Sequence, residues 1–311
     1  MLVNSATLVT EAFEPIGAAF DTTAAMVNHD CDPNTVMVFD GRQLSIRALV
    51  ELREGEEITI SYIDSSMPRE RRRDELEGKY FFKCQCRRCA GQRSLLDSFL
   101  CGCGGKANEA EGEGKLSCGK CDSVQPVELP KLRVIEGDAW AAVETGDTMK
   151  AIKALHKCQV WPLQRQPLPL LHHSIVHTEY IPTSSWNLAL LHSLLLYMRV
   201  DPVYYPQRHH PVRVVHGFTL ANLFLQITDV DYGKVIWGLL CETAAQVGKS
   251  HGEASRFAEI VRGKRAEVEH DLRAEEPTKV WVGMKLDEIG LSEELRKVMA
   301  LVDELVGDLK K

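Results

Sequence analysis

The sequence has no long hydrophobic run, no basic stretch at its amino terminus and no excess of positive charge. Its longest strongly apolar stretch, from Leu188 to Met198, is interrupted by His192. That stretch is about half of the roughly 20 residues that a membrane-spanning helix needs. The first thirteen residues contain no Lys or Arg, which argues against a secretory signal peptide. We therefore expect a protein without a membrane anchor, located in the nucleus, the cytoplasm or both.

The charge balance and composition narrow the possible classes of protein further. The 311 residues include 37 basic and 44 acidic side chains, and this net charge of -7 argues against a dedicated nucleic-acid binder. Basic side chains are concentrated between residues 69 and 93, so binding of nucleic acid by this segment is kept as a lesser alternative. With 44% apolar and 26% charged residues, the chain has an ordinary globular composition, and its length favours about two domains.

The first 80 residues predict strands followed by one helix. Apolar and β-branched residues over 35–39 and 44–49 flank the turn Asp40-Gly41, which predicts a hairpin. A third strand is expected over 58–63. Pro68 and Gly78 are placed to start and stop a helix over 68–79.

From about residue 128 the apolar periodicity becomes helical. Eight helices are predicted, over 129–144, 146–159, 169–180, 185–199, 212–227, 231–249, 253–272 and 291–309. The three prolines between 200 and 212 predict a loop there. Stacked helical hairpins of this kind resemble tetratricopeptide repeats, although no clean 34-residue repeat is found.

Cysteine spacing provides the first chemical signal. Ten cysteines are present, and seven of them lie between residues 84 and 121. Without a secretion signal, such clustering favours metal thiolates over disulfides. Three of these thiols form a C-x-C-x-x-C run that could fill three corners of a tetrahedral zinc site: Cys84, Cys86 and Cys89.

A second cysteine set has the spacing of a zinc ribbon. Its members are Cys101, Cys103, Cys118 and Cys121. Neighbouring glycines let the backbone turn tightly around a metal ion. Redox-active or uncoordinated thiols are the alternative for this set.

Three motifs then follow one another in an informative order. They are N-H-D-C-D-P-N over 28–34, G-E-E-I-T-I-S-Y over 55–62 and the C-x-C-x-x-C run. Together they resemble the C-terminal half of a SET-domain lysine methyltransferase. The arginine-rich helix, the Tyr80-Phe81-Phe82 run and the helical C-terminal region resemble the SET and MYND subfamily in particular.

This resemblance implies an α+β fold in four parts. The C-terminal part of a β-rich SET domain is expected over 1–67, and a helix with a zinc-bound post-SET segment over 68–93. A zinc-ribbon-like segment follows over 94–127, and an all-α tetratricopeptide-like domain over 128–311. The implied activity is S-adenosylmethionine-dependent methylation of a protein lysine, on a histone or another protein, by a chain expected to be monomeric.

The resemblance also implies individual roles. Tyr62 would line the methyl-transfer channel, and Cys31 would supply the fourth ligand of the first of two zinc ions. Five residues would contact S-adenosylmethionine or wall the lysine channel: Asn4, Asn28, His29, Tyr80 and Phe82. A narrow aromatic channel suits this reaction because positioning a neutral amine behind the sulfonium methyl can supply much of the rate.

Departures from the family pattern lead to a further expectation. No G-x-G precedes Asn28, no MYND finger is present, and Asp30 stands where the family has Ser. We therefore expect the chain to lack one wall of the cofactor site, to methylate poorly, and to leave apolar faces near Val36, Val38 and Ile60 uncovered. The alternative function is a non-catalytic zinc-containing protein-interaction module.

Overall fold

The computed structural model describes residues 5–10, 15–90, 99–100, 106–109, 114–126, 129–147, 150–151, 153, 164–165, 176, 180–227 and 232–275. Contacts divide the chain into two compact units. The first draws on the ranges 1–65, 74–86 and 205–298, and the second on 66–73, 87–204 and 299–311. Among the residues that the structure describes, no helix combines the length and hydropathy needed to cross a bilayer.

The first unit begins with three pairs of short strands. β1 (Ser5–Val9) and β2 (Pro15–Phe20) pair antiparallel, as do β4 (Thr35–Asp40) and β5 (Gln43–Ala48). The β4–β5 hairpin confirms the predicted one, and Gly41 in its turn has a φ of 58°. The short β3 (Asn28–His29) runs parallel to β6 (Thr59–Ile60), which brings the N-H motif beside the G-E-E-I-T segment.

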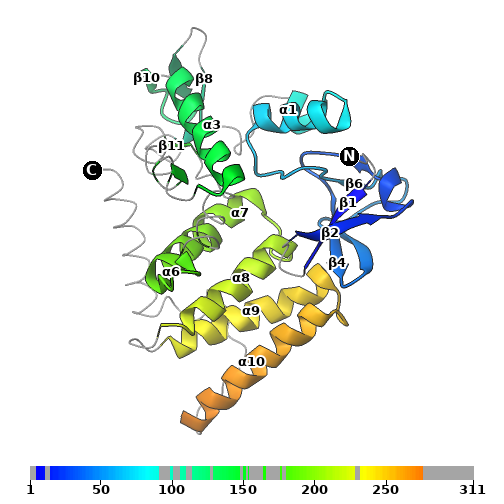
Figure 1. The fold of residues 1–311 in the computed structure, drawn as a ribbon, viewed down its shortest axis with the longest axis vertical. Coiled ribbons are helices and arrows are strands. Elements are labelled where there is room, and N and C mark those ends of the chain that lie inside the picture. The colour runs from blue at the N-terminus through cyan, green and yellow to red at the C-terminus, as the bar shows by residue number, and fades with distance from the viewer. Residues whose placement is uncertain are drawn as a thin grey trace. The chain divides into compact units, whose positions relative to one another are not determined.

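The described part of the first unit also contains three long helices. They are α8 (Pro211–Phe224), α9 (Gly233–His251) and α10 (Arg256–Glu275), and each lies against the next (Figure 1). One residue from each of them illustrates the shared apolar core, namely Val215, Val247 and Val261, all 5% exposed or less. The rings of Phe218 and Phe257 meet edge to face at 5.5 Å, which ties α8 to α10.

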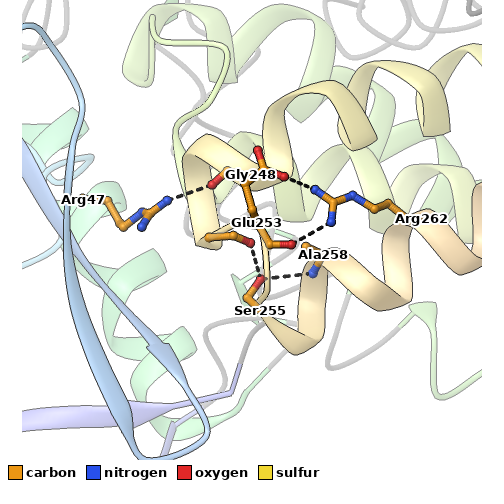
Figure 2. Close-up of polar contacts among 7 residues, drawn as sticks. Arg47, Gly248, Glu253, Ser255, Ala258 and Arg262 are labelled. Carbon is orange, nitrogen blue, oxygen red and sulfur yellow. Dashed lines mark hydrogen bonds and ion pairs between the residues drawn. The ribbon is translucent and has the colours of Figure 1, made fainter.

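The corner between α9 and α10 is bonded to the β4–β5 hairpin. Arg47 Nη2 donates to the carbonyl of Gly248 over 2.8 Å (Figure 2). Arg47 Nε also donates to the carbonyl of Lys249 over 3.3 Å. On the neighbouring strand, the carboxylate of Asp40 accepts the backbone N–H of Arg256 at 3.3 and 3.4 Å. A cation thus faces the C-terminal end of α9, and an anion faces the N-terminal end of α10, as the two helix dipoles favour.

The same corner is built tightly around Gly248. A Cβ atom there would lie 1.9 Å from Glu253 Oε1, so only glycine fits while Glu253 keeps this position. Arg262 holds Glu253 in place through two contacts. Its Nη1 donates to the backbone carbonyl of Glu253 over 2.7 Å, and its Nη2 donates to the Glu253 carboxylate (Figure 2). Ser255 caps α10 by accepting the N–H of Ala258 at 3.2 Å.

The second unit contains a small antiparallel sheet and further helices. The sheet has the order β10 (Val124–Pro126), β9 (Lys115–Cys118), β8 (Lys106–Glu109), β7 (Phe99–Leu100), β11 (Gln164–Arg165). Its described helical segments are α2 (Arg87–Ala90), α3 (Leu129–Thr145), α6 (Trp186–Leu195), η4 (Leu196–Val200) and α7 (Asp201–Tyr204). α1 (Arg69–Tyr80) contributes residues to both units.

Most of the predicted helices are confirmed where the structure describes them. The five confirmed ranges are 68–79, 129–144, 185–199, 212–227 and 231–249, and the range 253–272 is matched by α10 with a later start. Of the ranges 146–159 and 169–180 only isolated residues are described, and 291–309 lies outside the described residues. These three predicted helices are therefore not tested by the structure.

Three expectations are wrong in part. Asp201–Tyr204 is helical rather than loop, because Pro202 sits in the first turn, where no N–H donor is required. The third strand is only Thr59–Ile60, because the N–H of Tyr62 bonds to a histidine ring instead of to a neighbouring strand. Val38 and Ile60, expected to be uncovered, are each 3% exposed.

Candidate functional site

Four ring-bearing residues that the sequence proposed as site residues lie together in the first unit. His29 sits on β3, Tyr62 follows β6, and Tyr80 and Phe82 stand at the end of α1 and just beyond it. The Tyr62 ring centroid lies 4.9 Å from that of Tyr80, 5.3 Å from that of His29 and 6.5 Å from that of Phe82. The rings of His29 and Phe82 are 6.0 Å apart. The structure therefore gathers these four side chains into one aromatic cluster.

Hydrogen bonds fix the position of Tyr62 within this cluster. Its hydroxyl donates to the carbonyl of Val27 over 2.6 Å, and its own carbonyl accepts the hydroxyl of Tyr80 at 3.1 Å. Burial raises the pKa of Tyr62 above 10, with a further contribution from Tyr80. Burial also raises the pKa of the Tyr80 phenol. Both phenols are thus held protonated near neutral pH, with oxygen atoms that can still accept a hydrogen bond.

The chain leaves α1 through a strained residue. Phe81 has a φ of 62°, which a bulky side chain rarely adopts, and its side chain is 79% exposed. The turn it makes lets Tyr80 and Phe82 both face Tyr62, and Phe82 also faces His29, although Tyr80 and Phe82 are two residues apart on an irregular segment. Strain of this kind is kept where surrounding contacts over-determine it, and such positions are enriched at functional sites.

A polar network surrounds Asn28 on the same two strands. Asn28 Nδ2 donates to the carboxylate of Glu57 over 2.6 Å. Asn34 bonds across to the same segment, since its Oδ1 accepts the N–H of Thr59 at 2.8 Å and its Nδ2 donates to the carbonyl of Glu57 at 2.8 Å. Sequence reasoning did not identify Asn34 and Glu57 as site residues, although both lie inside quoted motifs. Their amide and carboxylate align β3 with β6 and therefore place Tyr62.

Four cysteine thiols converge beside the aromatic cluster. The Sγ atoms of Cys31, Cys84, Cys86 and Cys89 all lie within 4.8 Å of one another, and three of the four residues are buried. Cys31 Sγ is 3.9 Å from Cys84 Sγ. A tetrahedral zinc site with Zn–S bonds of about 2.3 Å needs sulfurs about 3.8 Å apart, so this donor set fits a zinc ion.

Asp30, the residue that departs from the family's serine, borders this thiol cluster. Its carboxylate accepts the N–H of Asp32 at 2.7 Å. The pKa of Asp30 is raised to about 6, mainly by burial and with a contribution from the neighbouring Cys86, against the lowering effect of that hydrogen bond. The substitution therefore adds an ionisable group at the edge of the cluster.

The predicted second cysteine set is described only in half. Cys118 ends β9 and is 1% exposed, and its Sγ accepts the N–H of Lys120 at 3.4 Å. Cys121 follows on the exposed turn, where its Sγ donates to Ser123 Oγ over 3.3 Å. Cys101, Cys103 and the proposed cofactor residue Asn4 lie outside the described residues.

Comparison with known proteins shows which family the N-terminal part of the chain is similar to. A family model described as "SET domain" matches residues 6–63, which include the N-H-D-C segment, the β4–β5 hairpin and Tyr62. Residues 6–63 of the first unit are therefore similar to the SET domain and are named the SET-domain segment.

Individual relatives then narrow the resemblance to the SET and MYND proteins, as the motifs predicted. "SET domain and MYND-type zinc finger protein 6" of Schizosaccharomyces pombe is 39% identical over 98 residues, 32% of this chain and 20% of that protein. "Histone-lysine N-methyltransferase SMYD3" of Mus musculus is 39% identical over 97 residues, 31% of this chain and 23% of that protein. "N-lysine methyltransferase SMYD2" of Homo sapiens is 38% identical over 86 residues, 28% of this chain and 20% of that protein. The chain thus covers about a fifth of the length of these relatives.

Proposed function

We propose that the aromatic cluster is the lysine channel of an S-adenosylmethionine-dependent protein-lysine N-methyltransferase. The observation that carries this proposal is the meeting of Tyr62, Tyr80 and Phe82 at the end of a segment that matches the SET domain. Tyr62 closes the G-E-E-I-T-I-S-Y motif, whereas Tyr80 lies 18 positions later at the end of α1, so their convergence depends on the fold and not on sequence proximity.

The chemistry needs little beyond positioning and electrostatics. A lysine amine must be neutral and aligned behind the methyl group that it accepts. Aromatic walls exclude water and lower the pKa of an ammonium group by desolvation. The Tyr62 hydroxyl donates a hydrogen bond to the carbonyl of Val27, so the Tyr62 oxygen can still accept a hydrogen bond from an N–H of the amine. This contact grows stronger as positive charge develops on nitrogen, and it therefore favours the transition state.

The residues proposed to contact the cofactor lie on or near β3. Asn28 is exposed beside the aromatic cluster, and its orientation is set by Glu57. We propose that Asn28, His29, Tyr80 and Phe82 contact S-adenosylmethionine, together with Asn4. When bound, S-adenosylmethionine supplies an electrophilic methyl group on a sulfonium.

Two zinc ions are proposed as structural metals. The proposed ligands of the first are Cys31, Cys84, Cys86 and Cys89, whose Sγ atoms all lie within 4.8 Å of one another. The second is held by Cys101, Cys103, Cys118 and Cys121. The Lys120 N–H bonded to Cys118 supports this site, because a backbone donor to sulfur stabilises a thiolate.

The next proposal concerns the protein that is methylated. A protein bearing the target lysine is the proposed substrate, and the name of the mouse relative makes a histone one candidate beside non-histone proteins. We propose that the tetratricopeptide-like helices over 128–311 contribute to substrate selection, and that the protein acts as a monomer in the nucleus, the cytoplasm or both.

We also propose that the 311-residue polypeptide, assayed alone, binds S-adenosylmethionine weakly and methylates slowly. No G-x-G precedes Asn28 in the sequence. The backbone groups of such a strand would bind the methionine end of the cofactor. Each absent polar contact is worth about 1 kcal/mol, and every 1.4 kcal/mol is about tenfold in affinity.

The experiment compares two polypeptides in one assay. Methyl transfer from radiolabelled S-adenosylmethionine to a histone mixture and to lysine-containing peptides is measured for the 311-residue chain. It is also measured for a fusion that adds the upstream SET segment of the fission yeast relative. We expect clear transfer by the fusion, a strong loss with Tyr62→Phe, and normal turnover with the control Tyr232→Phe. A folded, zinc-loaded fusion without any transfer or cofactor binding would instead favour the non-catalytic interaction module.

A further inference from the structure

His29 bonds on both sides of its ring. The backbone N–H of Tyr62 donates to His29 Nδ1 over 3.0 Å, and His29 Nε2 lies 3.3 Å from Cys31 Sγ. Because Nδ1 accepts a hydrogen bond, the neutral ring must carry its proton on Nε2. The proton on Nε2 therefore points at the sulfur of Cys31.

The geometry points to His29 as a positioning residue that ties the four-cysteine cluster to Tyr62. The metal ligand Cys31 lies at one end of this relay and the proposed channel residue Tyr62 at the other. This assignment rests on the proposed metal at the cysteines, but it does not depend on methyl transfer. It gives His29 a role in addition to the cofactor contact that is proposed above.

A donor on Nε2 has a defined effect on the metal site. An N–H directed at a thiolate withdraws charge from the sulfur and fixes the orientation of the ligand. Groups of this kind typically change metal affinity by about 10- to 100-fold when removed. The same geometry excludes His29 as a fifth ligand, because a nitrogen that carries a proton cannot bind the metal.

A second hydrogen bond connects Tyr62 to the segment that carries the cysteines. Since the Tyr62 N–H is used by His29, the backbone at this position leaves the strand pattern after Ile60. The carbonyl of Tyr62 accepts the Tyr80 hydroxyl at 3.1 Å, and Tyr80 precedes the run that carries Cys84. Tyr62 is therefore connected to the four thiols in two ways. The His29 side chain links it to Cys31, and its bond to Tyr80 links it to the segment that carries Cys84.

Three variants of the full chain separate a hydrogen-bonding role from simple packing. His29→Gln keeps a side-chain N–H that can reach Cys31, whereas His29→Leu keeps much of the volume and removes the donor. His270→Leu is the matched control, since His270 has an 85% exposed side chain. Zinc affinity is measured by competition with a chromophoric chelator, after zinc content has confirmed that the wild type holds the ion.

We expect His29→Leu to weaken zinc binding at the four-cysteine cluster about tenfold or more. His29→Gln should stay within a few-fold of the wild type, and His270→Leu should be unchanged. Wild-type affinity in a folded His29→Leu variant would overturn the assignment. If His29→Leu does not fold, the wild type alone decides through nitrogen-15 NMR of its histidines. His29 must then show protonated Nε2 and unprotonated Nδ1, and the opposite tautomer would refute the proposal.

Hydrogen exchange at the Tyr62 amide tests the other half of the relay. Removing zinc from the wild type should accelerate exchange at Tyr62, because the ring that accepts this N–H loses its anchor on Cys31. In His29→Leu the amide should exchange fast with or without zinc. If the Tyr62 amide of the wild type exchanged at the same rate with and without zinc, His29 would not couple the two sites. A wild type that binds no zinc there would refute the metal proposal, whereas methyl-transfer results leave this test unaffected.

Discussion

Arg47 Nη2 lies 2.8 Å from the carbonyl oxygen of Gly248, a residue 201 positions further along the chain (Figure 2). The contact joins a strand of the SET-domain segment to the C-terminal end of α9. Asp40 on the paired strand binds the first N–H of α10, and His209 Nε2 lies 3.3 Å from the carbonyl of Ala48. The helices after residue 205 are therefore bonded to the SET-domain segment rather than appended to it.

Arg47→Met should lower the free energy of unfolding by about 1–2 kcal/mol. The substitution keeps the aliphatic stem and removes two charge-assisted bonds to helix carbonyls. Urea unfolding at low ionic strength measures the loss. Arg42→Met, in the exposed turn of the same hairpin, is the matched control and should change stability by less than about 0.5 kcal/mol. Equal losses for both variants would contradict the assigned role of Arg47.

Asp40→Asn should cost about 0.5–1 kcal/mol, because it removes a negative charge from the N-terminal end of α10 while keeping an oxygen acceptor. The more informative measurement is the double variant with Arg47→Met. Both residues hold the same hairpin against the same helix corner, so their effects should be non-additive by about 0.5 kcal/mol or more. Strict additivity would mean that the two contacts act independently.

Acid should destabilise the first unit through His210. Burial lowers the pKa of His210 to about 3, aided by the neighbouring charges of His209, His216 and Arg213. The ring stacks on Tyr205 at 4.4 Å, and its Nδ1 accepts the N–H of Val212 at the start of α8. Because the folded-state pKa lies below the unfolded value of about 6.5, the unfolded chain binds the extra proton. Stability is therefore full above pH 6.5 and falls as the pH drops toward 3.

His210→Asn isolates this effect, since asparagine keeps an acceptor for the helix start and does not titrate. The variant should lose some stability at pH 7.5 and should approach or exceed the wild type by pH 5. The difference should change by at most about 1.4 kcal/mol per pH unit. Thermal unfolding across this range measures it, with the exposed His270→Asn as the control. Parallel pH profiles for wild type and His210→Asn would refute the assignment.

Cys31→Ala should release one zinc ion selectively. Its Sγ is one of four thiols within 4.8 Å, and the remaining three leave an open corner. Zinc analysis of protein prepared without chelator should give two ions per chain for the wild type and one for the variant. Cys241→Ala, on α9, should retain both. A wild type with fewer than two zinc ions would remove one of the proposed sites.

Local signals in the sequence were sufficient for much of the fold. The β4–β5 hairpin followed from alternation around Asp40-Gly41, and α1, α3, α8 and α9 followed from apolar spacing and proline or glycine boundaries. The four-residue α7 has no such signal, because three nearby prolines predict a loop, although proline is tolerated in a first helical turn.

The site was predictable to the extent that motifs carried it. Tyr62, Tyr80 and Phe82 were chosen by motif order, and the structure brings them together. The bonds of Asn34, Glu57 and His29 were not predictable, because a side chain that replaces a strand partner leaves no periodic trace. The contact between Arg47 and Gly248 was equally hidden, since nothing local marks an arginine as the cap of a distant helix.

The most direct test of the central claim is where S-adenosylmethionine binds on the zinc-loaded 311-residue chain. Amide NMR spectra are recorded during titration with S-adenosylmethionine, with adenosine triphosphate as a control for nonspecific purine binding. We predict weak but saturable shifts that centre on Asn28, His29, Tyr62, Tyr80 and Phe82, and that persist in Tyr62→Phe. S-adenosylmethionine that shifts none of these amides, or shifts them no more than adenosine triphosphate does, would contradict the assignment of the aromatic cluster as a methyl-transfer site.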